Sequence, residues 1–243
     1  AQKTVETLYS ALSNTLGGDE STYIPATSMF ILNDIESVSY FKDLAKQHSP
    51  LLKQVGYKKQ LATENMRLQR ADFAPQVALT GMAAFYNYQV SPIIPKWAVG
   101  AGVSLKIFDG LNREYKFSAA KSQIRQVEAV GHQAESDILT LIDKLYNEMV
   151  TYSQQLPSVN ASGRFAEEYL RIKEEAFKEG AAPSSDVVDA RLNLAKIRIE
   201  RLQAAYYYDM MLARLLEACG QSELFPDYGK RAAAMPIRYE HDF

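Results

Sequence analysis

The sequence predicts a mainly α-helical protein that carries one β-hairpin. Two segments, at about 76–88 and 97–108, alternate apolar with small or polar residues, which is the period of a β-strand. The flanking segments have the helical period. Two of them, at about 111–179 and 185–219, are far longer than the roughly 11–12 residues of an average helix. We therefore expect long helices on either side of a single strand pair.

The N-terminal part is predicted to hold two helical pieces joined by a connector. Leucines recur at every fourth position before Gly17-Gly18, a helix stop signal, so 1–18 is expected to be the end of a helix. Residues 19–37 form the connector. A helix is then expected at about 38–72, and Ser49-Pro50 either starts this helix proper or kinks it.

Each predicted strand has one apolar face and one small or polar face. In the first strand the apolar row holds Val77, Leu79, Ala83 and Phe85. In the second strand it holds Trp97, Val99, Ala101, Val103, Leu105 and Ile107. The segment between the strands contains Pro92 and Pro95, which predict a loop.

The helical segment after the hairpin carries a heptad seam. Apolar positions step by four and three from Ala120 to Tyr152, and only Gly131 and Glu148 spoil the pattern. Pro157 and Gly163 are expected to interrupt this helix, which resumes at about 164–179.

The last long helix carries two apolar stripes. One stripe contains Val188, Leu192, Ala195, Ile199, Leu202 and Tyr206. The other contains Val187, Ala190, Leu194, Ile197, Ala204, Tyr208, Met211 and Leu215. At 100° per residue the stripes lie roughly 130° apart, so we expect a neighbour on each side, as in a wall or tube of helices. Gly220 ends the helix, and 221–243 is expected to be a polar tail.

Composition excludes several classes of function. The chain has 243 residues and a net charge of −2, so it lacks the basic character of a nucleic-acid-binding protein. His48, His132 and His241 are far apart and lack the spacing of metal ligands. The single Cys219 excludes an internal disulfide and is interpreted as a small buried residue near a helix end. No cofactor and no metal are expected.

Two interpretations of the hairpin remain open from the periodicity alone. In the first, a water-soluble α+β protein packs its hairpin on helices. In the second, the apolar faces meet lipid, where strands exist only in closed barrels of usually eight or more strands. Two strands cannot close a barrel alone, so copies would have to assemble or the chain would have to be part of a longer one.

Three stretches resemble the second structural repeat of a TolC-family outer-membrane efflux protein. They are FAPQVALTGMAAFYNY, the segment that begins WAVGAGVSLKIFDGLNREYKFSAAK, and the segment that contains KEGAAPSSDVVDARLNLAK. The markers are a proline before the first strand, Phe-Asp-Gly followed closely by Arg113, and the pattern EG-x5-DVVDA-x3-L. The resemblance covers roughly 38–220. A full family member has two repeats, so the resemblance implies a fragment of a longer chain, with 1–18 as the end of the preceding repeat.

The resemblance implies an α-helical tube of long antiparallel helices and two strands contributed to an outer-membrane β-barrel. Family members form homotrimers in the Gram-negative envelope, with the barrel in the outer membrane and the tube in the periplasm. They act as passive export ducts of tripartite efflux or type I secretion systems, for drugs or other small molecules. The implied partners are a periplasmic adaptor (membrane fusion) protein and an inner-membrane pump. Aromatic residues near the strand ends, Tyr86, Tyr88 and Trp97, would lie at the membrane interface.

The resemblance also assigns roles around the turn before the last helix. The residues implied at the adaptor-docking tip are Glu179, Gly180, Ala181, Ala182 and Pro183. Asp186 and Asp189 match the two acidic positions that narrow the periplasmic entrance of the channel. Some members carry a basic residue two positions after the glycine, where this chain has Ala182, so an ionic latch at that position is not expected.

Asp186 and Asp189 have a simpler role as well. Acids in the first turn favour the positive end of the helix dipole by roughly 0.3–1 kcal/mol. A ring of six carboxylates in a trimer would in addition attract cations and repel anions. No nucleophile, histidine or phosphate loop lies nearby in the sequence, so no catalytic residue and no enzyme activity are expected. The alternative function is a soluble helical coiled-coil scaffold or adaptor protein.

Overall fold

The computed structural model describes residues 2–17, 28–32, 34–83 and 97–232. In chain order the elements are α1 (Gln2–Leu16), α2 (Val38–His48), α3 (Pro50–Ala71), β1 (Gln76–Ala83), β2 (Trp97–Ser104), α4 (Asn112–Lys178), α5 (Ser184–Ala218), the 3-10 helix η1 (Ser222–Leu224) and α6 (Phe225–Arg231). This order confirms the predicted fold class, a mainly helical chain with one hairpin. No helix in the described part of the chain combines the length and the apolar character needed to cross a membrane.

The chain divides into two units. The hairpin unit contains Lys42–Leu141 and Ala218–Gly220. The helix-pair unit contains Ala1–Phe41, Ile142–Glu217 and Gln221–Phe243.

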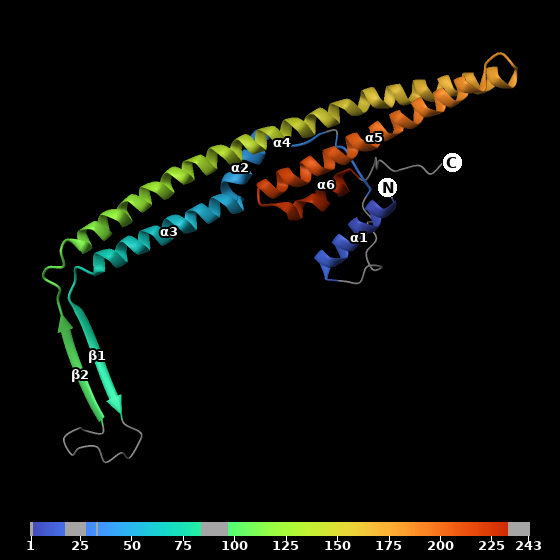
Figure 1. Cartoon of the computed structure of the whole chain (residues 1–243). Coiled ribbons are helices and arrows are strands. Elements are labelled where there is room, and N and C mark those ends of the chain that lie inside the picture. The colour runs from blue at the N-terminus through green and yellow to red at the C-terminus, as the bar shows by residue number, and fades with distance from the viewer. Residues whose placement is uncertain (1, 18–27, 33, 84–96, 233–243) are drawn as a thin grey trace. The chain divides into compact units, whose positions relative to one another are not determined.

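The two strands of the hairpin unit pair antiparallel in a register that separates two faces (Figure 1). Val77 lies opposite Val103, Leu79 opposite Ala101, and Ala83 opposite Trp97. Partners in an antiparallel pair point to the same side, so the large apolar side chains of the two strands, apart from Met82, share one face. The other face carries small or polar residues, as the alternation predicted, with Met82 as the exception. Phe85, also assigned to the apolar row, lies outside the described residues.

Above the hairpin in Figure 1, α3 and the first part of α4 run antiparallel and side by side. Lys59 forms an ion pair of 3.0 Å with Glu128, and the Asn65 amide donates to the Gln123 side chain at 3.2 Å. A Cβ on Gly131 would lie only 3.3 Å from Cγ1 of Val55. Gly131, which spoils the heptad seam, therefore lies where the opposite helix comes closest.

The break between α2 and α3 is built around Ser49 and Pro50. Ser49 has extended ψ (φ −52°, ψ 124°), and Pro50 begins α3, where its missing N–H is not needed. Gly220, just beyond α5, fits into this break with a φ of +71°. A Cβ at Gly220 would lie 2.4 Å from the His48 carbonyl oxygen and 2.9 Å from Cδ of Pro50. Only glycine fits there, because both the backbone conformation and the space exclude a side chain.

In the helix-pair unit, the second part of α4 and α5 run antiparallel and bury one core between them (Figure 1). Buried side chains of α4 include Ile142, Leu145, Met149 and Ala166, and those of α5 include Ala190, Leu194, Tyr208, Leu212 and Leu215. Tyr152 and Tyr207 stack across the pair with ring centroids 5.2 Å apart. Cys219, which belongs to the hairpin unit, is buried at the end of α5, as its interpretation from the sequence required.

The two predicted stripes of α5 differ in burial. The stripe that contains Val187 and Tyr208 faces this core. The stripe that contains Leu192 and Tyr206 stays at the surface, where these two side chains are 63% and 53% exposed. Of the two expected neighbours, the described residues therefore supply one, because α4 covers only one of the two stripes.

The expected interruption of α4 is also wrong. The helix runs unbroken over 67 residues with Pro157 inside it. An interior proline removes one backbone hydrogen bond and costs about 3 kcal/mol or more. Packing on both sides of Pro157 offsets this cost. Tyr152 stacks on α5, and Ile197 of α5 lies 3.8 Å from where a Cβ on Gly163 would be.

The connector before α2 is anchored on α5 and α6. Phe30 is buried and contacts Tyr208 and Phe225, with ring centroids 6.4 and 5.6 Å away. Its backbone N–H donates to Oδ2 of Asp209 at 3.2 Å. Further along, the Glu36 carboxylate accepts hydrogen bonds from Tyr228 (3.0 Å) and Arg231 (2.7 Å).

Candidate functional site at the turn between α4 and α5

The turn that joins α4 to α5 is closed by its own backbone. Gly180 adopts the left-handed conformation (φ +73°), and its N–H donates to the Phe177 carbonyl at 3.0 Å. The N–H groups of Ala181 and Ala182 both donate to the Ala176 carbonyl, at 2.8 and 3.2 Å. Glycine in this conformation is the common way to end a helix and to use its last free carbonyls. The turn is therefore a defined structure, which presents small side chains before α5 begins.

The two acids after the turn have different surroundings. Asp186 lies in the first turn of α5 and accepts a hydrogen bond of 2.7 Å from the Lys173 ammonium on α4. Asp189 is exposed and has no ion-pair or hydrogen-bond partner within the described residues. The two aspartates, three positions apart, are therefore not equivalent. The carboxylate of Asp186 is paired with a lysine, and that of Asp189 is exposed to solvent.

Lys173 is held from two sides. Besides Asp186, its ammonium lies 5.6 Å from the centre of the Tyr169 ring, within the range of a cation–π contact. The hydrogen bond to Asp186 raises the pKa of Lys173, so this side chain stays charged. The Lys173–Asp186 pair connects α4 to α5 close to the turn that joins them.

Two further ion pairs follow along the same two helices. Arg191 lies 2.7 Å from Glu174, and Arg198 lies 3.5 Å from Glu167. Their partners' positions step in opposite directions along the chain, as antiparallel helices require. Because these pairs are exposed, each adds little stability, and their main effect is on the register of the two helices.

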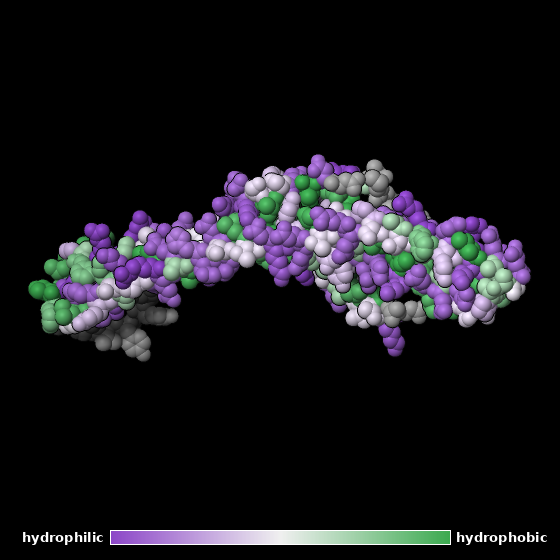
Figure 2. Space-filling view, turned by 90° about the horizontal axis from the view of Figure 1, so that it is seen from above, coloured by the Kyte–Doolittle hydropathy of each residue, from purple (hydrophilic) through white to green (hydrophobic). Residues whose placement is uncertain are grey.

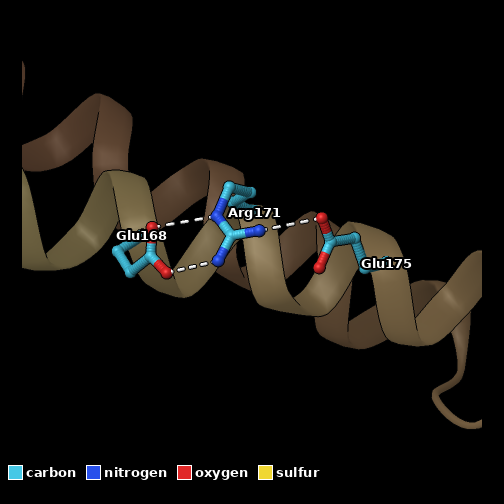
Figure 3. A network of polar contacts seen from close by, with 3 residues as sticks. All are labelled: Glu168, Arg171 and Glu175. Atoms are coloured by element: carbon cyan, nitrogen blue, oxygen red, sulfur yellow. Dashed lines mark hydrogen bonds and ion pairs between the residues drawn. The ribbon is translucent and has the colours of Figure 1, made fainter.

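The outer face of α4 carries a separate charged group near the turn (Figure 3). Arg171 donates to both oxygens of Glu168, at 2.9 and 2.5 Å, and to Glu175 at 2.8 Å. The hydrogen bonds from Arg171 lower the pKa of Glu168. These are local contacts within one helix, at the spacing that brings side chains together on its surface.

The aromatic residues assigned to the membrane interface are described only in part. Trp97 opens β2 on the apolar face and is 70% exposed. Tyr86 and Tyr88 lie outside the described residues.

The turn presents small side chains between charged residues of two helices. Within the ranges that the structure describes, no group of three or more His, Cys, Asp or Glu side chains could hold a metal ion. Several charged side chains near the turn form helix–helix or local pairs, whereas Lys178, Glu179 and Asp189 are exposed and have no side-chain partner among the described residues. What the turn can do is present a small-residue surface and an unpaired negative charge.

Sequence reasoning missed three residues that the structure makes prominent. Lys173 escaped notice because its pairing with Asp186 depends on the register of two helices. Asp209 lay at the end of a tyrosine run and was passed over, although an acid on a predicted buried helix was a usable signal. Arg113 was noted only as a marker of the family resemblance, because its contacts depend on how two separate links come together in the fold.

The fold is that of bacterial outer-membrane channels, by comparison with solved structures. VceC of Vibrio cholerae matches with a TM-score of 0.68 and 17% identity over 90% of this chain and 53% of that one. The open state of the MtrE channel of Neisseria gonorrhoeae matches with a TM-score of 0.73 and 18% identity over 91% and 51%. The CmeC channel of Campylobacter jejuni matches with a TM-score of 0.63 and 19% identity over 85% and 46%.

Residues 42–221 match the family model described as outer membrane efflux protein, so the chain belongs to that family. The resemblance to the TolC family is thereby confirmed. The chain spans about half the length of the solved channels that it matches. No curated protein sequence matches it.

Proposed function

We propose that this chain supplies one repeat of a homotrimeric outer-membrane channel, the passive exit duct of a tripartite efflux or type I secretion system for drugs or other small molecules. The hairpin would contribute to the barrel in the outer membrane, and the long helices would form part of a periplasmic tube. The observation that carries the proposal is the uniformly apolar face of the hairpin.

That face is exposed along its whole described length. Leu79 is 80% exposed, Val99 74% and Val103 73%. Figure 2 shows hydrophobic residues at the surface of the left end of the molecule, where the hairpin and its links lie. Apolar surface gains roughly 25 cal/mol per Å² when it leaves water, so a face of this kind favours a lipid or protein cover. Each strand also has one edge that the hairpin leaves unpaired, which in lipid demands further strands. A barrel completed by other copies meets both needs, whereas a soluble scaffold accounts for the helices alone.

The exposed stripe of α5 supports assembly in the same way. Val188, Leu192 and Ile199 are all more than half exposed, although they follow a helical packing pattern. A neighbouring helix from another copy or repeat would cover them, as in a closed tube.

The turn at 179–183 is proposed as the tip on which the periplasmic adaptor docks, with an inner-membrane pump beyond it. Its small side chains and closed backbone suit close packing by a helical partner. Of the two aspartates, Asp189 has no partner among the described residues and is the better candidate for a charge at the channel entrance. Asp186 is partly neutralised by Lys173.

The membrane proposal is tested with matched substitutions in the full-length gene product. Leu79→Arg places a charge on the apolar face, and Ala78→Arg places it on the opposite face of the same strand. In lipid the first change costs up to about 2–4 kcal/mol near the bilayer centre. We expect Leu79→Arg to reduce detergent-extractable trimer in the membrane fraction, and Ala78→Arg to spare it. A soluble monomer of the unaltered protein, or equal effects of both changes, contradicts the proposal.

The entrance proposal is tested by conductance in planar bilayers. Asp189→Asn is expected to weaken block by divalent cations more than Asp186→Asn does, with both together having the largest effect. Glu200→Gln, on the same helix but far from the turn, serves as the control. Unchanged block and selectivity in all three aspartate variants would reject the role at the entrance.

A further inference from the structure

The hairpin is joined to its helices by two short links that run side by side (Figure 1). Residues 72–75 connect α3 to β1, and residues 105–111 connect β2 to α4. The second link contains Gly110 and Leu111, both with positive φ (71° and 66°). Neither link contributes a residue to a buried core. The links alone therefore do not fix the orientation of the two strands relative to α3 and α4.

The Arg113 side chain bridges both links. Its guanidinium donates to the Asp72 carbonyl at the end of α3 (3.5 Å) and to the Ile107 carbonyl after β2 (3.4 Å). Its Nε lies 3.2 Å from Oδ2 of Asp109, just before α4. The same group lies over the ring of Phe73, 5.0 Å from its centre. One side chain thus contacts two residues of each link.

The contacts of Arg113 are largely shielded from water, which strengthens them. The Arg113 side chain is 11% exposed and that of Asp109 19%, although most of the surrounding residues are exposed. The hydrogen bonds to the two carbonyls are long, so each is weak alone and their effect comes from acting together. The Phe73 ring also contacts the ring of Phe117 edge to face, with centroids 6.3 Å apart.

We propose that Arg113 is a positioning residue that sets the direction in which the strand pair leaves the helix pair α3–α4. The inference concerns the geometry of this chain and holds whether or not the chain forms a channel. The contacts require arginine in particular. A planar guanidinium can donate to two carbonyls at once while its charge lies beside a carboxylate and its flat face lies over an aromatic ring, whereas a lysine ammonium can reach one of these groups at a time.

The test measures distances between spin labels in the full-length protein, diluted with unlabelled chains so that only distances within a chain contribute. One label pair, Ala101→Cys with Lys121→Cys, reports the hairpin against α4. The other, Gln60→Cys with Lys121→Cys, reports α3 against α4. Both pairs are placed in a Cys219→Ala background, because the native thiol must not be labelled.

We expect the first pair to give one narrow distance in the parent protein and to lose it in Arg113→Ala and Arg113→Lys. The second pair should keep its narrow distance in both variants, which shows that the helices remain folded. Arg67→Ala removes an exposed arginine that pairs only locally with Glu64 and should change neither distance.

Three results would overturn the proposal. The first is a narrow hairpin distance in Arg113→Lys and Arg113→Ala. The second is equal broadening of both label pairs, which would make Arg113 a general folding residue. The third is recovery of the narrow distance when Asp109→Arg is combined with Arg113→Asp. That exchange restores the ion pair without the carbonyl contacts, so recovery would mean that the ion pair alone suffices.

Discussion

Replacing Asp209 by asparagine should remove a pH-dependent loss of stability from the helix-pair unit. The Asp209 carboxylate lies on α5 beneath the connector, where Oδ2 accepts the Phe30 N–H and Oδ1 has no hydrogen-bond partner among the described residues. Burial raises the pKa of Asp209 from 3.8 to about 7, against the smaller opposing effect of the Phe30 hydrogen bond.

The direction of the effect follows from proton binding. The folded chain holds a proton on Asp209 at pH values where the unfolded chain has lost it. The stabilisation is therefore complete below about pH 4 and is lost as the pH rises to about 7. A shift of about 3 units corresponds to about 4 kcal/mol at 1.36 kcal/mol per unit. Because Asp209 is half-buried, water screens part of this, and we expect about 2 kcal/mol.

The assay is urea unfolding of the detergent-solubilised protein, followed by circular dichroism at several pH values between 4 and 8. Asparagine keeps an oxygen for the Phe30 N–H but cannot ionise. Asp209→Asn should therefore match the parent at pH 4 and exceed it by about 2 kcal/mol at pH 8. Other titrating groups cancel in the difference between the two proteins.

A difference between Asp209→Asn and the parent that does not change with pH would refute this reasoning. So would an asparagine variant that is the less stable protein at pH 8. Either result would mean that the carboxylate is solvated or paired in the folded state.

Three other substitutions test the packing. Gly220→Ala should cost at least about 2 kcal/mol of unfolding free energy, because strain and a contact with the carbonyl that ends α2 add together. Gly180→Ala, with the same backbone strain but open space around it, should cost about 1–2 kcal/mol; equal losses would refute the steric part. Leu215→Ala, in the core, should cost about 2–5 kcal/mol, while Leu192→Ala should leave the unassembled chain within about 0.5 kcal/mol and weaken the trimer. Pro157→Ala should raise the thermal midpoint of α4 by restoring a backbone hydrogen bond, and a lower midpoint would show that the proline geometry is needed.

Local patterns in the sequence predicted most of the fold. The hairpin followed from alternation, since the side-chain period of a strand is two and the register of β1 and β2 keeps both apolar rows on one side. The two stripes of α5 predicted two neighbours, and the chain itself supplies one of them. What local pattern could not predict was the outcome where packing competes with propensity. Proline disfavours the interior of a helix, so Pro157 predicted an interruption. The helix continues through it because α5 packs on α4 both before and after this position.

The candidate site was predictable in its residues and less so in their environments. Asp186 and Asp189 were chosen together by their spacing, yet only Asp186 meets a cation. That difference depends on the position of Lys173 on the opposite helix. This position could be predicted only from the conformation of the turn, which sets the register of the two helices. The contacts of Arg113 likewise depend on two links that lie side by side in the fold. The sequence could therefore identify Arg113 as a family marker without showing which residues it contacts.

The fit of Gly220 into the break before Pro50 has a consequence for how such chains can diverge. A helix end and a helix break 170 positions apart share one small space, in which a single added carbon would meet a backbone oxygen. A descendant that acquired a side chain at the first place would have to reshape the second, by moving the proline or closing the gap between the two helices. We expect the two places to change as a unit, so that a sequence without the glycine is also a sequence without this break.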